Sequence, residues 1–380
     1  MTTGKKLRGL ILRSLRSQGF RRRRGLILPP PDDKDRLRRL HLTAVEHKLA
    51  RSGPGLWPYE NRLLGHIAAG RSIDFKKIQP RLVEVSPDSE DELLFRYAAI
   101  HWTIPVSSGY GRRLRFLVMD EQNDKLIGII GLGDPVFNLA VRDTWIGWDK
   151  NSRRIHLQNV MDAFVLGAVP PYSHLLCGKL VAMLTASREV REAFHRKYGS
   201  RRSVIRRQMS DARLALVTTM SALGRSSIYN RLRYKDRTLF KSLGYSQGSG
   251  EFHFSNGVYG AIFEYAERHC TATAKKSRWG NGFRNRREVI RKCLRRIGLP
   301  PDLLYHGIHR EVFGVPLARN TREFLRGEHS KLLWYNLSVT DLSDWFRERW
   351  LLQRASWDFR YRDFDPCSYR LWQPRGQDAR

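Results

Sequence analysis

The stretch Gly128–Asp149, "GIIGLGDPVFNLAVRDTWIGWD", decides the fold because it joins an apolar strand to a polar turn. Its first residues are apolar or glycine, which is typical of a strand in the core of a sheet. Asp134 follows directly, and Asp143 comes a few residues later. In α/β folds the ends of such strands open into the cleft where chemistry takes place. We therefore expect an α/β core with carboxylates at the end of one strand.

This strand end does not form a nucleotide-binding loop. "GLGDP" lacks the third glycine of G-x-G-x-x-G, and no G-K-[ST] follows. Asp134 and Asp143 could instead bind a metal ion or act as a general base. The alternative is that both cap turns and pair with Arg142 or another nearby arginine, and the residues leave both readings open. We expect Trp145 and Trp148 to pack against the core, and stacking on bases is the alternative.

The segments around this stretch predict the rest of the core. "RRLRFLVMD" and "KLIGIIGL" predict a hairpin, and "AFVLGAV" and "ALVTTM" predict two more buried strands. "SEDELLFRYAAIHW" predicts a helix in which Ser89 and Glu92 have capping-box spacing. "LLCGKLVAMLTASREVREAFHRKYG" predicts one long helix, and "SSIYNRLRYKDRTLFKSLGY" a second. "SGEFHFSN" alternates like an edge strand. The predicted α/β (α+β) core covers residues 81–256.

Helical regions are expected on both sides of this core. Residues 1–80 form a basic N-terminal region, which begins with a helix whose apolar stripe is Leu7, Leu10, Ile11 and Leu15. Residues 257–380 form a basic, aromatic-rich C-terminal region. Its arginine-covered helix has an apolar stripe made of Val289, Ile290, Cys293, Leu294 and Ile297.

The charge balance indicates a polyanionic partner. The 380 residues include 69 Lys and Arg against 37 Asp and Glu, a formal net charge of +32. Such a surface favours nucleic acid, with an anionic membrane surface and a merely solvated basic surface as alternatives. No apolar run reaches the ~18 residues of a membrane span. Four cysteines lie far apart without C-x-x-C spacing, which is typical of the reducing cytoplasm.

Basic segments at both ends of the chain alternate with aromatic residues, as in "SRWGNGFRNRR". Arginine and lysine neutralise phosphates, while aromatic rings stack on unpaired bases. An acid-free, arginine-rich N-terminus also matches an organellar transit peptide, but a basic arm explains it equally well. The predicted nucleic-acid-binding residues are Arg21, Arg22, Arg23, Arg24, Lys275, Lys276, Arg278, Trp279, Arg284, Arg286 and Arg287.

Glu251 and His253 form a second candidate catalytic pair, because alternation places them on one face of the expected edge strand. Together with Asp134 or Asp143 they could hold Mg²⁺ for phosphodiester hydrolysis. The alternative is that they face solvent on an edge strand. No H-N-H or H-E-x-x-H motif accompanies them, so the sequence leaves open whether the protein is an enzyme.

The order of strands and helices resembles the acyl-CoA N-acyltransferase fold. "LFKSLGYSQGSG" is similar to a late signature of that superfamily, but Phe240 stands where the family has its tyrosine general acid. The pyrophosphate loop is reduced to "SHLLCGKL", which leaves Gly178 at the helix start as the candidate cofactor-binding residue. The resemblance implies acyl-CoA as a cofactor, but the chain lacks the family's general acid and most of its pyrophosphate loop.

Three stretches together resemble the DruA family of bacterial Druantia anti-phage defence operons: the opening stretch, "NVMDAFVLGAVPPYSHLLCGKLVAMLTAS" and "LFKSLGYSQGSGEFHFSNGVY". The resemblance covers residues 75–270. It implies a cytoplasmic defence component that acts beside other operon proteins, including a helicase-like one. It supplies no catalytic mechanism. We expect a DNA-binding component, with a nucleic-acid-modifying enzyme (a metal-dependent nuclease or an acyltransferase) or a transposase-related DNA-binding protein as alternatives.

Overall fold

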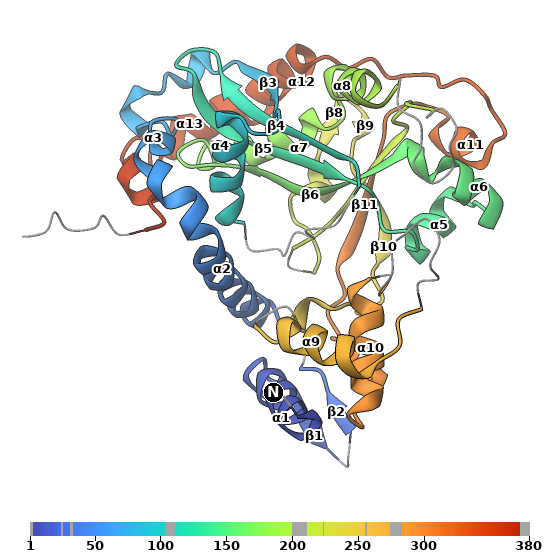
Figure 1. Cartoon of the computed structure of the whole chain (residues 1–380). Helices are drawn as coiled ribbons and strands as arrows, with labels where there is room; N and C mark the ends of the chain where they lie inside the picture. Colours follow the sequence, from blue (N-terminus) through green and yellow to red (C-terminus); the bar gives the residue numbers. More distant parts are fainter. Residues whose placement is uncertain are drawn as a thin grey trace, which may run out of the picture. The chain divides into compact units, whose positions relative to one another are not determined.

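The structure is a computed structural model that describes residues 3–23, 26–30, 33–102, 111–199, 211–222, 224–254, 257–273, 283 and 285–372. Within these residues the chain forms two compact units (Figure 1). Unit 1 is built from Met1–Lys48 and Ser246–Arg310. Unit 2 is built from Leu49–Trp102, Val106–Tyr245 and Glu311–Arg380. Each unit therefore combines segments that are far apart in the sequence.

A seven-stranded sheet forms the centre of unit 2, in the order β10-β11-β7-β6-β5-β4-β3. Only β6 and β7 are parallel, and every other pair of neighbours is antiparallel. The mixed sheet and its helices confirm the predicted α/β class. The strands are β3 (Pro80–Glu84), β4 (Arg113–Asp120), β5 (Lys125–Gly133), β6 (Val160–Ala168), β7 (Leu216–Met220), β10 (Lys241–Tyr245) and β11 (Glu311–Pro316).

Helices cover both faces of this sheet. Along β4, Phe116 and Val118 belong to the same apolar cluster as Leu180 of α7. Leu117, between them, faces the other side and shares a cluster with Leu94 of α4. The helices of unit 2 are α3 (Glu60–Leu64), α4 (Glu90–Ile100), α5 (Ala140–Ile146), α6 (Lys150–His156), α7 (Cys177–Leu184), α8 (Arg188–Tyr198), α11 (Thr321–Arg326), α12 (Val339–Phe346) and α13 (Leu352–Trp357).

Several predicted elements of the core are confirmed. The hairpin is β4 and β5, and the two further buried strands are β6 and β7. Ser89 caps the start of helix α4, and its hydroxyl accepts the Glu92 N–H at 3.2 Å. The single long helix expected after β6 is wrong, because two helices, α7 and α8, occupy that segment. The break has a local cause: the Ser187 hydroxyl accepts the Val190 N–H at 3.3 Å and begins α8.

Two other expectations about secondary structure are wrong. The helix expected over "SSIYNRLRYKDRTLFKSLGY" is a 3₁₀ turn (Tyr229–Arg231) followed by short strands β8 (Arg233–Tyr234) and β9 (Arg237–Thr238) and by β10. Lys235, at φ 52°, forms the left-handed turn between β8 and β9. The edge strand expected at "EFHF" is a 3₁₀ turn, Phe252–Phe254, in unit 1.

Unit 1 contains α1 (Gly4–Ser17), α9 (Tyr259–His269) and α10 (Arg286–Arg296), together with the hairpin of β1 (Arg21–Arg23) and β2 (Leu26–Leu28). Helix α2 (Lys34–Leu56) begins in the range of unit 1 and ends in that of unit 2. The stripes predicted for the first helix and for the arginine-covered helix are confirmed in one apolar cluster, which contains Leu7, Ile11, Leu15, Val289, Ile290, Cys293, Leu294 and Ile297. Across the described residues, no helix is both long and apolar enough for a membrane crossing.

Candidate functional site

Asp134 follows the last residue of β5 and pairs with Arg112, which precedes β4. The Arg112 Nε donates to Asp134 Oδ1 at 2.6 Å, and the Arg112 backbone N–H donates to Oδ2 at 2.9 Å. Gly111, at φ 126°, lies against this carboxylate so closely that a β-carbon would overlap it. The carboxylate therefore closes the open end of the β4–β5 hairpin.

Asp143 lies in α5 between two arginines. Arg142, which has no exposed surface, donates to Asp143 Oδ1 through Nε at 2.8 Å. Arg153 of α6 reaches Oδ2 at 3.0 Å. Arg142 also donates to the Val136 carbonyl at 2.8 Å, so the segment between β5 and α5 wraps around its guanidinium. Burial lowers the pKa of Arg142, and the charge of Asp143 opposes that shift.

Asp162 on β6 is a further acid at this end of the sheet that the motifs above do not single out. The Thr218 hydroxyl of β7 donates to its Oδ1 at 2.8 Å. Burial raises the pKa of Asp162 to about 6, against the hydrogen bond from Thr218 and the charge of Arg142. A carboxyl with this pKa exchanges protons near neutral pH. The signal in the sequence is a single acid inside the apolar run "VMDAFVLGAV".

Glu251 and His253 lie in unit 1, whereas Asp134 and Asp143 lie in unit 2. His253 is buried, stacks on Phe20, and its Nε2 donates to the Leu303 carbonyl at 2.6 Å. Burial lowers its pKa to about 4, so the imidazole is neutral at physiological pH. Within the part of the chain that the structure describes, no three His, Cys, Asp or Glu residues form a group that could hold a metal ion.

Gly178 is the second residue of α7. A β-carbon there would meet no atom within 4 Å, so space is open beside this helix start. Two neighbouring N–H groups already have partners: that of Cys177 donates to the Tyr172 carbonyl at 3.1 Å and that of Lys179 to the Leu176 carbonyl at 2.8 Å. The start of α7 therefore offers an anion fewer free donors than an uncapped helix would.

Of the predicted binding residues that the structure describes, four are exposed and Arg286 is half-buried. Arg21, Arg22 and Arg23 form β1, and all three are exposed. Arg286 places its guanidinium 3.8 Å from the centre of the Tyr259 ring, and Arg287 donates to the Ser249 hydroxyl at 2.7 Å. The other predicted binding residues lie outside the described residues: Arg24, Lys275, Lys276, Arg278, Trp279 and Arg284.

Arg287 is also the first member of an arginine row on α10. Arg291 and Arg295 follow it at intervals of four residues, and all three are exposed. Residues four apart lie on one face of a helix, about 6 Å apart along its axis. Arg291 and Arg295 are absent from the binding residues predicted above, although the helical period of the apolar stripe opposite them could have identified them.

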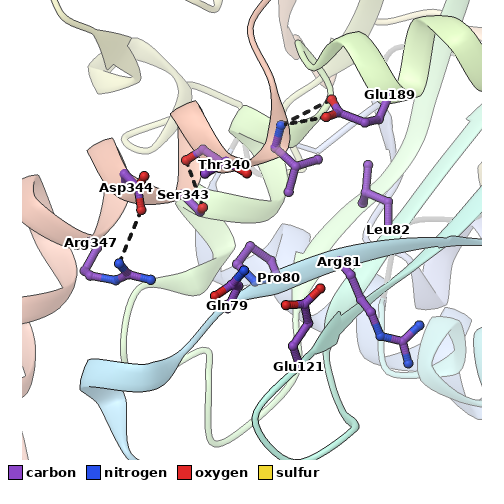
Figure 2. Close-up of a pocket in the computed structure, with 11 residues that line it drawn as sticks. Gln79, Pro80, Arg81, Leu82, Glu121, Glu189, Thr340, Ser343, Asp344 and Arg347 are labelled. Carbon is purple, nitrogen blue, oxygen red and sulfur yellow. Dashed lines mark hydrogen bonds and ion pairs between the residues drawn. The ribbon is translucent and has the colours of Figure 1, made fainter.

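A cavity of about 310 Å³ lies in unit 2 beside the edge strand β3 (Figure 2). The Glu189 carboxylate accepts the Val339 N–H at 3.2 Å, and Arg347 pairs with Asp344 at 3.2 Å. The charged residues that line the cavity are Arg81, Glu121, Glu189, Asp344 and Arg347. Its three carboxylates outnumber its two arginines, so this cavity does not suit a polyanion.

Comparison with known proteins gives the class of this protein. The family described as "DruA: Druantia protein DruA" matches residues 31–327, so the chain belongs to the DruA family. The "Druantia protein DruA" of Escherichia coli (strain UMEA 4076-1) is 39% identical over 372 residues, which cover 97% of this chain and 90% of that protein. These matches confirm the family resemblance drawn from the sequence. No solved structure matches the chain.

Proposed function

We propose that this chain is the DNA-binding component of a Druantia-type anti-phage defence system in the bacterial cytoplasm. Membership of the DruA family supports the defence role. The observation that carries DNA binding is the exposed arginine row of α10, Arg287, Arg291 and Arg295, in a chain with a net charge of +32. Among the described residues, Arg291 and Arg295 form no ion pair. Their charges are therefore available to phosphates.

The test is a salt titration of DNA binding by the full-length chain. Fluorescence anisotropy with a duplex of about 30 base pairs, between about 50 and about 400 mM salt, gives the slope of log affinity against log salt. Arg291→Gln/Arg295→Gln should reduce that slope by about 2, because each phosphate contact contributes about 0.9. Lys76→Gln/Lys77→Gln removes the same charge from exposed residues of unit 2 and is the matched control. Equal slopes for both variants would reject the α10 row as the interface.

A second candidate is an enzyme that acts on nucleic acid, a metal-dependent nuclease or a transposase-related protein. The observation that favours it is Asp162, a carboxyl whose pKa of about 6 suits proton transfer. Asp134 and Asp143 already pair with arginines, which supports a structural role for both. Cleavage of a labelled duplex with Mg²⁺ or Mn²⁺, lost in Asp162→Asn and retained in Glu192→Gln, would support the enzyme.

An acyl-CoA N-acyltransferase core also remains a proposal. It is supported by the single parallel pair β6–β7 and by the connection between these strands through α7, at whose start Gly178 lies. Phe240 is buried and stacks on Tyr229 at 4.8 Å, so the position of the family's general acid carries no hydroxyl. Saturable binding of coenzyme A in calorimetry would support this candidate, and its absence would reject it.

The family also suggests that the chain acts beside other proteins of its operon, including a helicase-like one. Co-expression of the operon and purification through a tag on this chain tests that association. Recovery of the helicase-like protein at a salt concentration that releases DNA would support a direct contact.

A further inference from the structure

Lys179 of α7 contacts Trp350, which lies in the same π-helical turn as Arg349 in unit 2. Lys179 lies on α7, Arg231 ends the 3₁₀ turn before β8, Arg349 lies in the π-helical turn before α13, and Arg354 lies on α13. Burial lowers the pKa of Lys179, and the charges of Arg231, Arg349 and Arg354 lower it further. The charges of the three arginines therefore act on Lys179 without a carboxylate to offset them.

Few carboxylates balance these charges. Within the described part of unit 2, Lys179, Arg231 and Arg349 form no ion pair, and only Arg354 reaches a carboxylate, that of Asp358. The ammonium group of Lys179 lies 4.7 Å from the centre of the Trp350 ring, which holds it by a cation–π contact. Like charges held together without acids cost free energy, and a bound anion would remove that cost.

Two exposed aromatic residues follow Arg354 in the chain. Trp357 is 60% exposed and Phe359 is 49% exposed. The Arg354 guanidinium lies 4.2 Å from the centre of the Trp357 ring. Asp358, between the two aromatic residues, is buried and also pairs with Arg360 at 2.7 Å. Asp358 therefore fixes the backbone from which both rings project.

We propose that this surface binds single-stranded nucleic acid; it is defined by Lys179, Arg231, Arg349, Arg354, Trp357 and Phe359. The inference rests on the proposed nucleic-acid-binding function and names a second, distinct ligand-binding surface in unit 2. Phosphates lie on the cations, and unpaired bases stack on the two rings. A duplex keeps its base faces stacked inside the helix, so exposed rings of this kind discriminate in favour of single strands.

The test compares single and double strands on the full-length chain. Anisotropy is measured with an oligothymidylate of about 20 nucleotides and with a duplex of about 20 base pairs. Trp357→Ala/Phe359→Ala should weaken oligothymidylate binding by about tenfold or more and change duplex binding by less than about twofold. Trp357→Phe keeps a stacking ring and should retain most of the affinity. Phe137→Ala removes a ring that is 59% exposed and lies 4.8 Å from Arg153, and it is the matched control.

A charge variant gives an independent measurement. Lys179→Gln/Arg349→Gln should lower the salt slope of oligothymidylate binding by about 1.4, because each phosphate on a single strand contributes about 0.7. Unchanged oligothymidylate binding in both the ring variant and the charge variant overturns the proposal.

The remaining outcomes separate this inference from the proposed function. A wild-type chain that binds the duplex and ignores single strands overturns the inference and leaves the proposed function standing. A wild-type chain that binds neither overturns both. Binding of polyglutamate that is weakened by the same ring substitutions would assign the surface to an acidic protein and overturn the inference.

Discussion

Arg112 and Asp134 close the open end of the β4–β5 hairpin, since Asp134 accepts both the backbone N–H and the Nε of Arg112 at 2.9 and 2.6 Å. Arg112 also donates to the Gln158 carbonyl, at 2.5 Å, and so ties the hairpin to the segment before β6. A carboxylate with these contacts has a structural task whether or not it takes part in chemistry.

Replacing Asp134 with Ala should lower the free energy of unfolding by about 1–2 kcal/mol, because two donors of Arg112 lose their acceptor at a partly exposed site. Urea denaturation measures the loss. Glu192→Ala removes a carboxylate from an exposed helix pair with Arg188 and should change stability by less than about 0.5 kcal/mol. If Asp134→Ala/Asp143→Ala folds and still protects cells from phage, both acids are structural. Loss of protection by a folded variant would instead give them a role in chemistry.

Asp162 should make the protein less stable as pH rises from about 4 to about 6. Its folded-state pKa of about 6 lies above the usual value of 3.8, so the folded state binds the proton more tightly than the unfolded chain. The stabilisation is complete below the unfolded pKa and is lost as pH rises through the folded one. As pH rises from about 4.5 to about 7.5, the free energy of unfolding of Asp162→Asn should therefore increase by about 2 kcal/mol relative to that of the wild type.

Urea denaturation of both proteins at the two pH values measures this difference. Thr218→Val removes the hydrogen bond that favours the charged form, and it should widen the pH effect. A wild type and an Asp162→Asn variant with the same pH dependence would show that Asp162 is ionised at neutral pH without cost.

His253 should make unit 1 less stable as pH falls, which is opposite to the effect of Asp162. Its folded-state pKa of about 4 lies below the usual 6.5, because burial disfavours the imidazolium. The stabilisation by the neutral imidazole is complete above the pKa of His253 in the unfolded chain. It is lost as pH falls through the pKa of His253 in the folded state. As pH falls from about 7 to about 4, the free energy of unfolding of the wild type should decrease by about 3 kcal/mol more than that of His253→Gln.

The measurement for His253 should report on the apolar cluster that surrounds it. Exchange of the α1 and α10 amides with solvent, followed by mass spectrometry, reports opening of the cluster in which Phe20 and Phe254 pack. His66, which is partly exposed, is the control: His66→Gln should leave the acid-induced opening as it is in the wild type. The same opening at about pH 4 in His253→Gln would contradict the prediction.

Gly70 should tolerate no side chain. A β-carbon there would overlap the Tyr361 carbonyl, and the Gly70 N–H donates to the Phe364 carbonyl at 2.9 Å. Gly70→Ala should cost about 2–3 kcal/mol in urea denaturation and should weaken oligothymidylate binding, because Phe359 lies two residues before Tyr361. Gly178→Ala has open space and a helical site, and it should be neutral or stabilise by up to about 1 kcal/mol. Equal effects of the two substitutions would contradict this reading of Gly70.

Local periodicity was enough to predict the elements whose partners are near in sequence. The hairpin β4–β5 and the apolar stripe of α10 follow from alternation and from helical spacing. Strand β11 was not predictable in this way, because "EVFGVP" is short and its partner β7 lies about ninety residues earlier. The environment of Asp162 depends on Thr218 and Arg142, which reach it from separate elements. The cations around Lys179 also come from distant segments, so no motif could identify them.

The order of segments in unit 1 has a consequence for biosynthesis. The apolar stripe of α1, formed by Leu7, Ile11 and Leu15, packs in a cluster with α9 and α10, which leave the ribosome more than two hundred residues later. At about 5–20 residues per second the nascent chain carries this stripe unpaired for roughly 10–50 seconds. During that interval the exposed apolar face of α1 is available to chaperones. Its basic residues are available to the negatively charged ribosomal RNA. Unit 1 can therefore complete its folding only after residue 296 has been translated. By then most residues of unit 2 have already been synthesised.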